Sequence, residues 1–182
     1  MHMVAPTYWT ADMVRALPDD GQRYETVHGE LLVSPSPRER HQAAHRELMI
    51  DIGNYLRAEP VGVLYSSPSD ISWGRPDVLV QPDLLVVDPI ELRSGAWADV
   101  RRLLLAVEIL SPSSNRADRF TKRTLYQRQG VETYWVVDAD ARAVEVWTAG
   151  SVFPVVEETT LRWHPDGAST ALEISLGQLF AR

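Results

Sequence analysis

The spacing of hydrophobic residues changes along the chain, and one long segment has the period of a helix. Between positions 38 and 58, apolar side chains recur every three or four residues, as in a helix with one buried face. This stripe consists of Ala44, Leu48, Met49, Ile52, Tyr55 and Leu56. A second helix is expected over residues 115–129, where Gly130 would provide a left-handed stop. A short helix should begin at the N-cap Thr10 and end before Pro18.

Other segments have the short apolar or alternating runs that are typical of strands. Residues 23–34 predict a hairpin with His28 and Gly29 at its turn, and residues 133–148 predict a second hairpin. The turn of the second hairpin is expected around 138–141. The remaining strand candidates and a short terminal element lie in 61–65, 77–80, 83–88, 103–110, 151–158 and 171–180. This order predicts one α/β domain in which helices pack on a mixed sheet.

No internal repeat or low-complexity linker divides the chain, so we expect a single domain over residues 1–182. An N-terminal helix and hairpin would occupy 1–36, a core with the candidate site 37–148, and C-terminal strands 149–182. A chain of 182 residues is long enough to bury a substantial core.

Composition excludes several classes of protein without indicating an activity. The 45% hydrophobic and 24% charged residues are ordinary for a globular domain, and no apolar run approaches the roughly 18 residues of a membrane span. The first residues lack a secretory pattern and the chain has no Cys, so we expect a cytoplasmic protein without a membrane partner. A net charge of −7 argues against broad nucleic-acid binding by a basic surface, although a local basic groove stays possible.

Glu108 is unusual because it lies inside the apolar run LLLAVEIL (103–110). An isolated buried carboxylate costs several kcal/mol unless a partner compensates it. If 83–88 and 103–110 are antiparallel neighbours with Asp88 opposite Leu103, then Asp83 lies opposite Glu108. Their Cβ atoms would be about 5 Å apart, and a divalent cation such as Mg²⁺ would remove the repulsion between the carboxylates. The alternative is a strand start at Asp83 and a solvated Glu108, and the pair alone does not decide between them.

Lys122 is a candidate partner for these carboxylates. It lies about seven residues into the predicted helix, or on the order of 10 Å along its axis. Glu108 lies about 7 Å before the end of its strand, so the lysine side chain could reach it. The alternative is an exposed i,i+4 pair with Asp118, worth only about 0.3–0.5 kcal/mol.

Several other patterns favour structural roles. His41 and His45 have the spacing of the zinc-protease signature H-E-x-x-H, but Gln42 replaces the glutamate base. We therefore interpret the pair as helix surface, with His41 as a candidate to face the site. Asp70 and Asp77 are expected to be structural. The tryptophans are expected to pack cores or interfaces rather than bases. They include Trp73, Trp97, Trp135, Trp147 and Trp163.

Four motifs in a fixed order resemble a known family. They are VQPDLLVVD (80–88), LAVEILSPSS (105–114), the D-x-x-x-K-x-x-x-Y of residues 118–126, and GVETYWVVD (130–138). Together they resemble the Uma-two family, the domain of unknown function 820 group of restriction-type endonucleases in the PD-(D/E)XK nuclease superfamily. RYETVHGELL, SPSPRERHQAAHREL and LEISLGQLF extend the resemblance over most of the chain. The resemblance implies a restriction-endonuclease-like mixed sheet flanked by helices, with hairpins at both ends.

The resemblance also implies which residues form the site. Asp83 matches the aspartate of the PD motif, and Glu108 matches the acidic residue of the second motif. The superfamily lysine two residues later is Leu110 here, which departs from the general pattern. The Uma-two group instead takes its lysine from the following helix, which indicates Lys122. Glu30 in HGEL and His41 in RERHQ match further recurrent positions and are expected to complete the pocket.

The implied chemistry is metal-assisted hydrolysis of DNA phosphodiester bonds. Asp83 and Glu108, with the Ile109 carbonyl, would hold Mg²⁺ or Mn²⁺, which lowers the pKa of a bound water. Lys122 would orient that water or stabilise charge on the phosphoryl oxygens. The DNA backbone would contact arginines on the same helix, although for any one of them a solvated helix face is the favoured interpretation. These arginines are Arg116, Arg119, Arg123 and Arg128.

We therefore expect a Mg²⁺-dependent endodeoxyribonuclease. The rival hypothesis is a nuclease-fold binding module without turnover, favoured by the acidic balance and by Leu110 in place of lysine. A homodimer is also expected, because cutting both strands of a duplex benefits from two sites. Apolar edge strands in TYWVV (133–137) or VEVW (144–147) could supply its interface.

Overall fold

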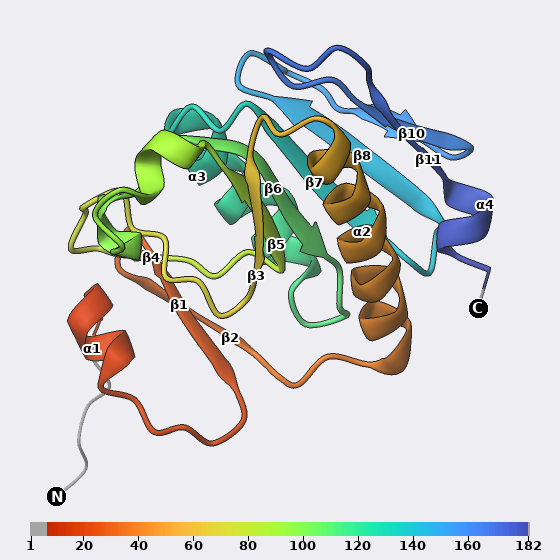
Figure 1. Ribbon diagram of the computed structural model, residues 1–182. Helices are drawn as coiled ribbons and strands as arrows, with labels where there is room; N and C mark the ends of the chain where they lie inside the picture. Colours follow the sequence, from red (N-terminus) through yellow and green to blue (C-terminus); the bar gives the residue numbers. More distant parts are fainter. Residues whose placement is uncertain (1–6, 182) are drawn as a thin grey trace, which may run out of the picture.

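The centre of the fold is a mixed β-sheet, seen in a computed structural model that describes residues 7–181 (Figure 1). The prediction that the first residues form no secretory signal involves residues 1–6, and these lie outside the described range. In the six-stranded sheet the order is β3-β5-β6-β7-β8-β9, and β6 and β7 are parallel while the other neighbours are antiparallel. The strands are β3 (Val63–Ser66), β5 (Leu84–Val87), β6 (Leu103–Ile109), β7 (Thr133–Asp138), β8 (Ala143–Thr148) and β9 (Val155–Glu157).

The long helix α2 (Glu39–Ala58) covers one face of the sheet. Its buried stripe of Ala44, Leu48, Ile52, Tyr55 and Leu56 agrees with the prediction. Met49 was also expected in the stripe, but its side chain is 40% exposed. It follows Leu48 by about 100° around the helix axis, which turns it away from the sheet.

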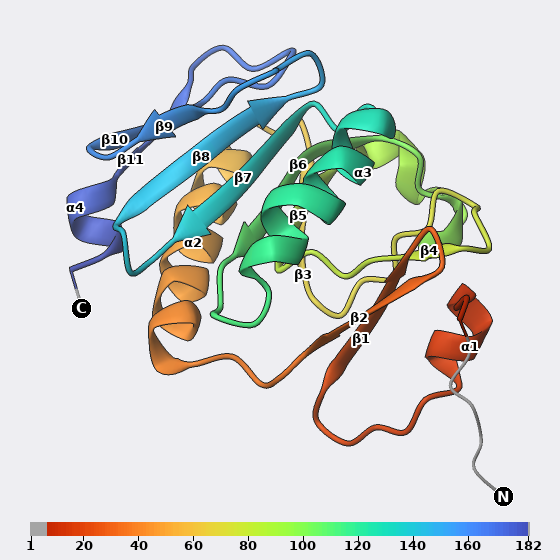
Figure 2. The same cartoon turned by 180° about the vertical axis from the view of Figure 1, so that it is seen from behind.

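The opposite face of the sheet is covered by the helix that connects β6 to β7 (Figure 2). One α-helix was predicted over 115–129. The structure instead has a π-helical segment, η3 (Ala117–Lys122), followed by α3 (Arg123–Arg128). Gly130 ends the helix with φ of 72°, as expected. Because side chains alternate along a strand, Val107 faces α2 while Glu108 points toward the η3–α3 side.

The predicted N-terminal elements are confirmed. Thr10 caps α1 (Ala11–Arg15), and its Oγ1 accepts a hydrogen bond from the Met13 amide at 3.3 Å. The hairpin of β1 (Arg23–Val27) and β2 (Glu30–Ser34) turns at His28 and Gly29, whose φ angles are both positive. With β4 (Val78–Leu79) it forms a three-stranded sheet of order β2-β1-β4 beside the helix α3.

The register predicted between β5 and β6 is correct at one end and wrong at the other. Leu84 pairs with Val107, and the expected register continues to Val86, which pairs with Leu105. Val87 then pairs with Leu103, so Asp88 does not lie opposite Leu103 as predicted. One extra residue of β6 interrupts the ladder there, as in a β-bulge. The predicted register therefore holds from Leu84 to Val86, one residue after Asp83, and the pairing of Asp83 with Glu108 stays a prediction.

The C-terminal segment adds a small sheet on the α2 side. It consists of β10 (Thr160–Trp163) and β11 (Leu172–Ser175), followed by α4 (Leu176–Leu179). Apolar residues of both strands pack into the core around α2. The sequence predicted no separate β10, because the run TLRW is too short to stand out between two turns. Two 3₁₀ turns, η1 (Pro89–Leu92) and η2 (Trp97–Asp99), lie in the connection before β6.

The proposed dimer edges are wrong, because neither predicted strand lies at an edge. β7 is paired with β6 and β8, and β8 is paired with β7 and β9. The edge strands of the six-stranded sheet are β3 and β9. Among residues 7–181, no helix has the length and apolar character needed to cross a membrane.

Candidate active site

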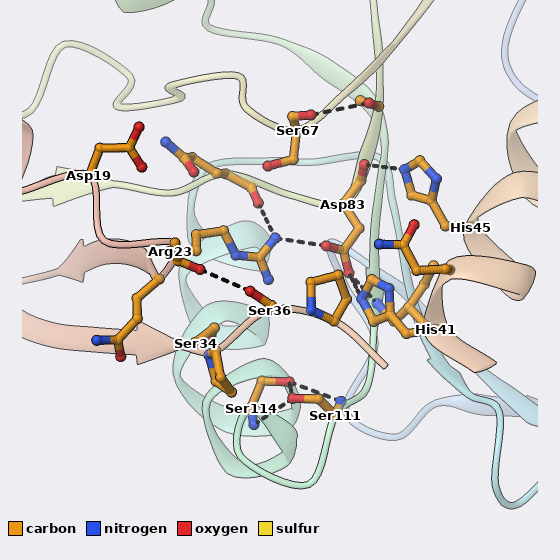
Figure 3. Close-up of a pocket in the computed structure, with 18 residues that line it drawn as sticks. Asp19, Arg23, Ser34, Ser36, His41, His45, Ser67, Asp83, Ser111 and Ser114 are labelled. Atoms are coloured by element: carbon orange, nitrogen blue, oxygen red, sulfur yellow. Dashed lines mark hydrogen bonds and ion pairs between the residues drawn. The ribbon is translucent and has the colours of Figure 1, made fainter. Parts of the chain in front are cut away.

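Asp83 lies immediately before β5, at the end of the central sheet, and is 4% exposed. Its Oδ1 accepts a hydrogen bond from Arg23 at 2.7 Å. Its Oδ2 accepts from the Ile109 amide at 2.8 Å and from His41 Nε2 at 3.0 Å. Arg23 comes from the N-terminal hairpin and His41 from α2, so one carboxylate joins elements on both sides of the sheet (Figure 3).

These donors keep Asp83 ionised. Burial by itself raises the pKa of its carboxyl group. The hydrogen bond from His41 and the positive charge of Arg23 outweigh burial, and the pKa of Asp83 falls below its ordinary value. The same pairing raises the pKa of Arg23 above its ordinary value through Glu25 and Asp83, although burial opposes it. Asp83 and Arg23 therefore form a charged pair.

Glu108 faces a partner inside the protein rather than water. It is 0% exposed, and its Oε1 accepts hydrogen bonds from Lys122 Nζ at 3.0 Å and from the Tyr126 hydroxyl at 2.8 Å. Lys122 thus reaches Glu108, as the distances along helix and strand had indicated. Its part in catalysis stays a prediction.

Lys122 is surrounded by three carboxylates. Besides Glu108, its Nζ lies 2.7 Å from Glu25 Oε2 and 3.4 Å from Asp118 Oδ1. The i,i+4 pair with Asp118 therefore exists, but it is buried and is not the weak exposed contact that was considered. Lys122 is also the only lysine of the chain, and its side chain is 1% exposed. We call Glu25, Glu108, Asp118 and Lys122 the lysine cluster.

Three acids around one ammonium cannot all ionise cheaply in a buried place. Burial raises the pKa of Glu108 above its ordinary value, although Lys122 opposes this. Burial raises the pKa of Asp118 in the same way. Burial alone would lower the pKa of Lys122, but the carboxylates of Glu108, Glu25 and Asp118 raise it. Lys122 therefore stays protonated, whereas burial favours the protonated forms of Glu108 and Asp118.

Arg23 connects Asp83 with the lysine cluster. Its Nε lies 3.8 Å from Glu25 Oε2, while its Nη1 donates a hydrogen bond to Asp83 Oδ1. Gln81 strengthens the link, because its amide donates to Glu25 Oε1 at 2.7 Å and its carbonyl accepts from Arg23 at 3.1 Å. Asp83 and the three acids of the cluster make four carboxyl groups against the two cations Arg23 and Lys122. If all ionise, two negative charges are in excess.

A cavity of about 430 Å³ opens beside Asp83 and Arg23 (Figure 3). Its wall is rich in hydroxyl groups and contains both histidines of HQAAH. The lining residues used below are Arg23, Ser36, His41, Ser67, Asp83 and Ser111. A second cavity of about 380 Å³ shares His41 and Ser111 with the first. The four members of the lysine cluster are absent from the lining of either cavity.

The chemical types of the side chains at the site suit a hard divalent cation. Carboxylate oxygens are the ligands that Mg²⁺ prefers, and its positive charge would favour ionisation of the buried acids whose pKa values burial raises. Within residues 7–181, the buried Oε2 of Glu108 has neither a hydrogen bond nor an ion pair, whereas Glu25 Oε2 and Asp118 Oδ1 are held by their ion pairs with Lys122. The described part of the chain contains no preformed group of three histidine or acidic side chains that could hold a metal ion. A bound ion would therefore need rearranged side chains or several waters, which Mg²⁺ commonly keeps.

The structure corrects two predictions, the place of Glu30 in the pocket and the surface position of the histidine pair. Glu30 is exposed at the turn end of the hairpin, opposite Val27, and is not among the residues of either cavity. Glu25, two residues from Val27 on the same strand, occupies the buried site instead. His41 does face Asp83, but the interpretation of the histidine pair as helix surface is wrong. His45 Nε2 lies 3.2 Å from the Asp83 carbonyl, because i and i+4 share a helix face.

The arginines expected to contact DNA are not among the lining residues of either cavity. Arg119 is bonded to Glu145 at 2.7 Å and to Asp138 at 2.9 Å. Arg123 stacks over Trp147, with its guanidinium carbon 4.7 Å from the ring centroid. These two arginines therefore hold the helix against β7 and β8. The remaining two, Arg116 and Arg128, are exposed.

The two aspartates and the tryptophans that were expected to have structural roles make structural contacts. Asp70 accepts from Arg15 and Gln81, and Asp77 pairs with Arg75. Of those tryptophans, Trp73, Trp135, Trp147 and Trp163 are buried, and Trp97 is partly buried and packs against the core. Ile109 lines the first cavity and gives its amide to Asp83, while the expected use of its carbonyl as a ligand stays a prediction.

Comparisons with known proteins cover nearly the whole chain. The model of the Uma2 family, with the description "Putative restriction endonuclease", matches residues 11–179. The crystal structure of a "putative nuclease belonging to DUF820" from Anabaena variabilis ATCC 29413 is similar, with a TM-score of 0.78 at 22% sequence identity. The similarity covers 95% of this chain and 98% of that chain, which confirms the expected fold. No curated protein matches the sequence.

Proposed function

The chain belongs to the Uma2 family of restriction-endonuclease-like proteins, and from this premise we propose that it is a metal-dependent endonuclease hydrolysing phosphodiester bonds of DNA. The observation that carries the proposal is the lysine cluster. The only lysine of the chain is held by three buried carboxylates, one of them on the strand beside Asp83. Burying so many charges destabilises a fold, which favours a catalytic use for them.

The metal ligands would come from two neighbouring strands. Asp83 and Glu108, with the Ile109 carbonyl, would hold Mg²⁺ or Mn²⁺. A bound ion would supply a Lewis acid for the phosphoryl oxygen and lower the pKa of a bound water. Tyr126 would keep Glu108 in place through its hydroxyl hydrogen bond of 2.8 Å.

The other side chains would position the substrate and the water. Lys122 stays protonated, and once the cluster rearranges around a bound ion its ammonium would stabilise negative charge that develops on the phosphoryl oxygens. His41 would hold the orientation of Asp83 through its hydrogen bond to Oδ2. Hydroxyl groups of Ser36, Ser67 and Ser111 line the cavity and are suited to bind phosphate oxygens of the DNA backbone.

Cleavage of supercoiled plasmid in Mg²⁺ or Mn²⁺ tests the proposal. Metal-dependent nicking by the wild type should be lost in Glu108→Ala and Lys122→Ala. Glu30→Ala is the matched control, because this glutamate is exposed and outside the cavities. Equal nicking by all four proteins would show that another site or a contaminant cleaves the plasmid.

The second candidate is a nuclease-fold binding module without turnover. It is favoured because Arg23 and Lys122 already neutralise the two carboxylates that a metal would need. Melting temperature in Mn²⁺ distinguishes the two functions. A nuclease should melt higher with Mn²⁺, and the increase should vanish in Asp83→Ala/Glu108→Ala. A wild type that is indifferent to Mn²⁺ and Mg²⁺ would favour the binding module.

A further inference from the structure

The carboxylate of Asp83 is nearly saturated with hydrogen-bond donors. An ionised carboxylate has about four lone-pair positions. Arg23 occupies one on Oδ1, while His41 and the Ile109 amide occupy two on Oδ2. A metal ion that binds Asp83 must therefore share this carboxylate with its present donors or replace one of them.

Arg23 is the donor that a cation would displace. The Ile109 amide is part of β6 and cannot withdraw without breaking the sheet. His41 projects from the first turn of α2 and can stay on the other oxygen. Arg23 carries a full positive charge directly on Oδ1, so it is repelled by a divalent ion bound to the same group.

Arg23 has room to move without leaving the site. Its side chain is 20% exposed and lines the cavity, whereas Lys122 is sealed in the cluster at 1% exposure. The contacts to Glu25 and to the Gln81 carbonyl hold the guanidinium near its present place. A planar guanidinium at a cavity wall is well suited to bind a phosphate with two hydrogen bonds.

We propose that Arg23 is a resident cation of the site: it holds Asp83 until a divalent metal ion replaces it, and it then binds the substrate phosphate. This inference rests on the proposed function and adds a residue that touches the substrate. It predicts opposite effects of one substitution, namely tighter metal binding and slower cleavage. A residue with only a structural role would weaken both.

Mn²⁺ binding by calorimetry, without DNA, provides the first readout. Arg23→Met keeps the length of the side chain and removes its charge, and we expect it to bind Mn²⁺ about tenfold more tightly than the wild type. Arg23→Lys keeps the charge and should bind Mn²⁺ with nearly the wild-type affinity. Arg75→Met is the control, because Arg75 is an exposed arginine that pairs with Asp77 and does not line the cavity. Circular dichroism confirms that each variant is folded.

Plasmid nicking at saturating Mn²⁺ provides the second readout. Arg23→Met should cleave about 10²-fold more slowly than the wild type despite its tighter metal binding. If the wild type binds Mn²⁺ and Arg23→Met binds it equally or more weakly, the displacement is wrong and the nuclease proposal stands. If cleavage by Arg23→Met is unchanged, the phosphate contact is wrong. If neither protein binds Mn²⁺, the metal-dependent function itself fails, and this inference fails with it.

Discussion

Lys122 Nζ lies 2.7 Å from Glu25 Oε2, and this buried ion pair joins the N-terminal hairpin to the helix between β6 and β7. Both side chains are 1% exposed, so neither charge can be compensated by water if the other is removed. The hairpin is therefore part of the site and supplies an acid that the four family-like motifs do not contain. Its Arg23, two residues before Glu25, supplies the cation on Asp83.

The first prediction concerns Glu25. Glu25→Gln keeps the size of the side chain and a hydrogen bond with the Gln81 amide. It removes the negative charge that faces Lys122. We expect kcat for plasmid nicking to fall about 10²-fold while KM changes little, because Glu25 acts through Lys122 rather than on the DNA. Glu30→Gln on the same hairpin should behave like the wild type. Unchanged kcat in Glu25→Gln would limit Glu25 to a structural role.

The second prediction concerns the identity of the buried cation. Lys122→Arg keeps the charge, but a guanidinium is larger and planar, and the site around Lys122 is closed. We expect loss of nicking and a decrease of about 1–3 kcal/mol in the free energy of unfolding by urea. Lys122→Ala should cost about 3–5 kcal/mol, because it leaves the acids without their cation. Arg128→Lys, exposed on the same helix, should change neither quantity.

The positions of Asp83 and Glu108 could be predicted because they depend on local rules. Period-2 alternation and the antiparallel register place the two acids at adjacent ends of β5 and β6. The helix that carries Lys122 was predicted from its place before the Gly130 stop, although Lys122 lies in a π-helical turn that the sequence did not predict. The error at Asp88 came from a bulge in β6, which apolar runs do not reveal.

Glu25, Arg23 and His45 could not be assigned in the same way. Alternation in RYETV shows only that positions 23, 25 and 27 share one face of the hairpin. That this face packs on the lysine cluster depends on how the hairpin sheet meets α3, which is tertiary structure. His45 faces Asp83 because α2 crosses the end of β5. One compositional signal was available: a chain with 18 Lys and Arg residues has only one lysine, Lys122.

The third prediction concerns acid stability at the turn between β7 and β8. Hydrogen bonds from the Ala141 amide and from Arg119 outweigh burial and hold the pKa of Asp138 below its ordinary value. A depressed pKa in the folded state adds stability above the unfolded pKa, and this stability is lost as the pH falls through the folded value. Urea unfolding at pH 7 and pH 3 should therefore show a smaller acid-induced loss of stability in Asp138→Asn than in the wild type. An equal loss would mean that Asp138 does not contribute.

The last prediction concerns the free edge at β9. Val155 and Val156 point to opposite faces of the strand and are 60% and 54% exposed, and Phe153 just before them is 81% exposed. An uncovered apolar edge strand can pair with a second copy of itself. Antiparallel pairing about Val156 would place Val155 opposite the partner's Glu157, so like charges would not face each other.

We therefore expect a dimer of twice 20.5 kDa by light scattering. Phe153→Ser/Val156→Lys should be a folded monomer, because it removes apolar area and places two lysines opposite each other at the centre of the pairing. Ile50→Ser is the matched control, since Ile50 is 49% exposed on α2, away from β9, and its loss should leave the dimer intact. A wild type that is monomeric at working concentration would contradict the edge pairing. Two active sites would then have to meet on a duplex by successive binding rather than within one assembly.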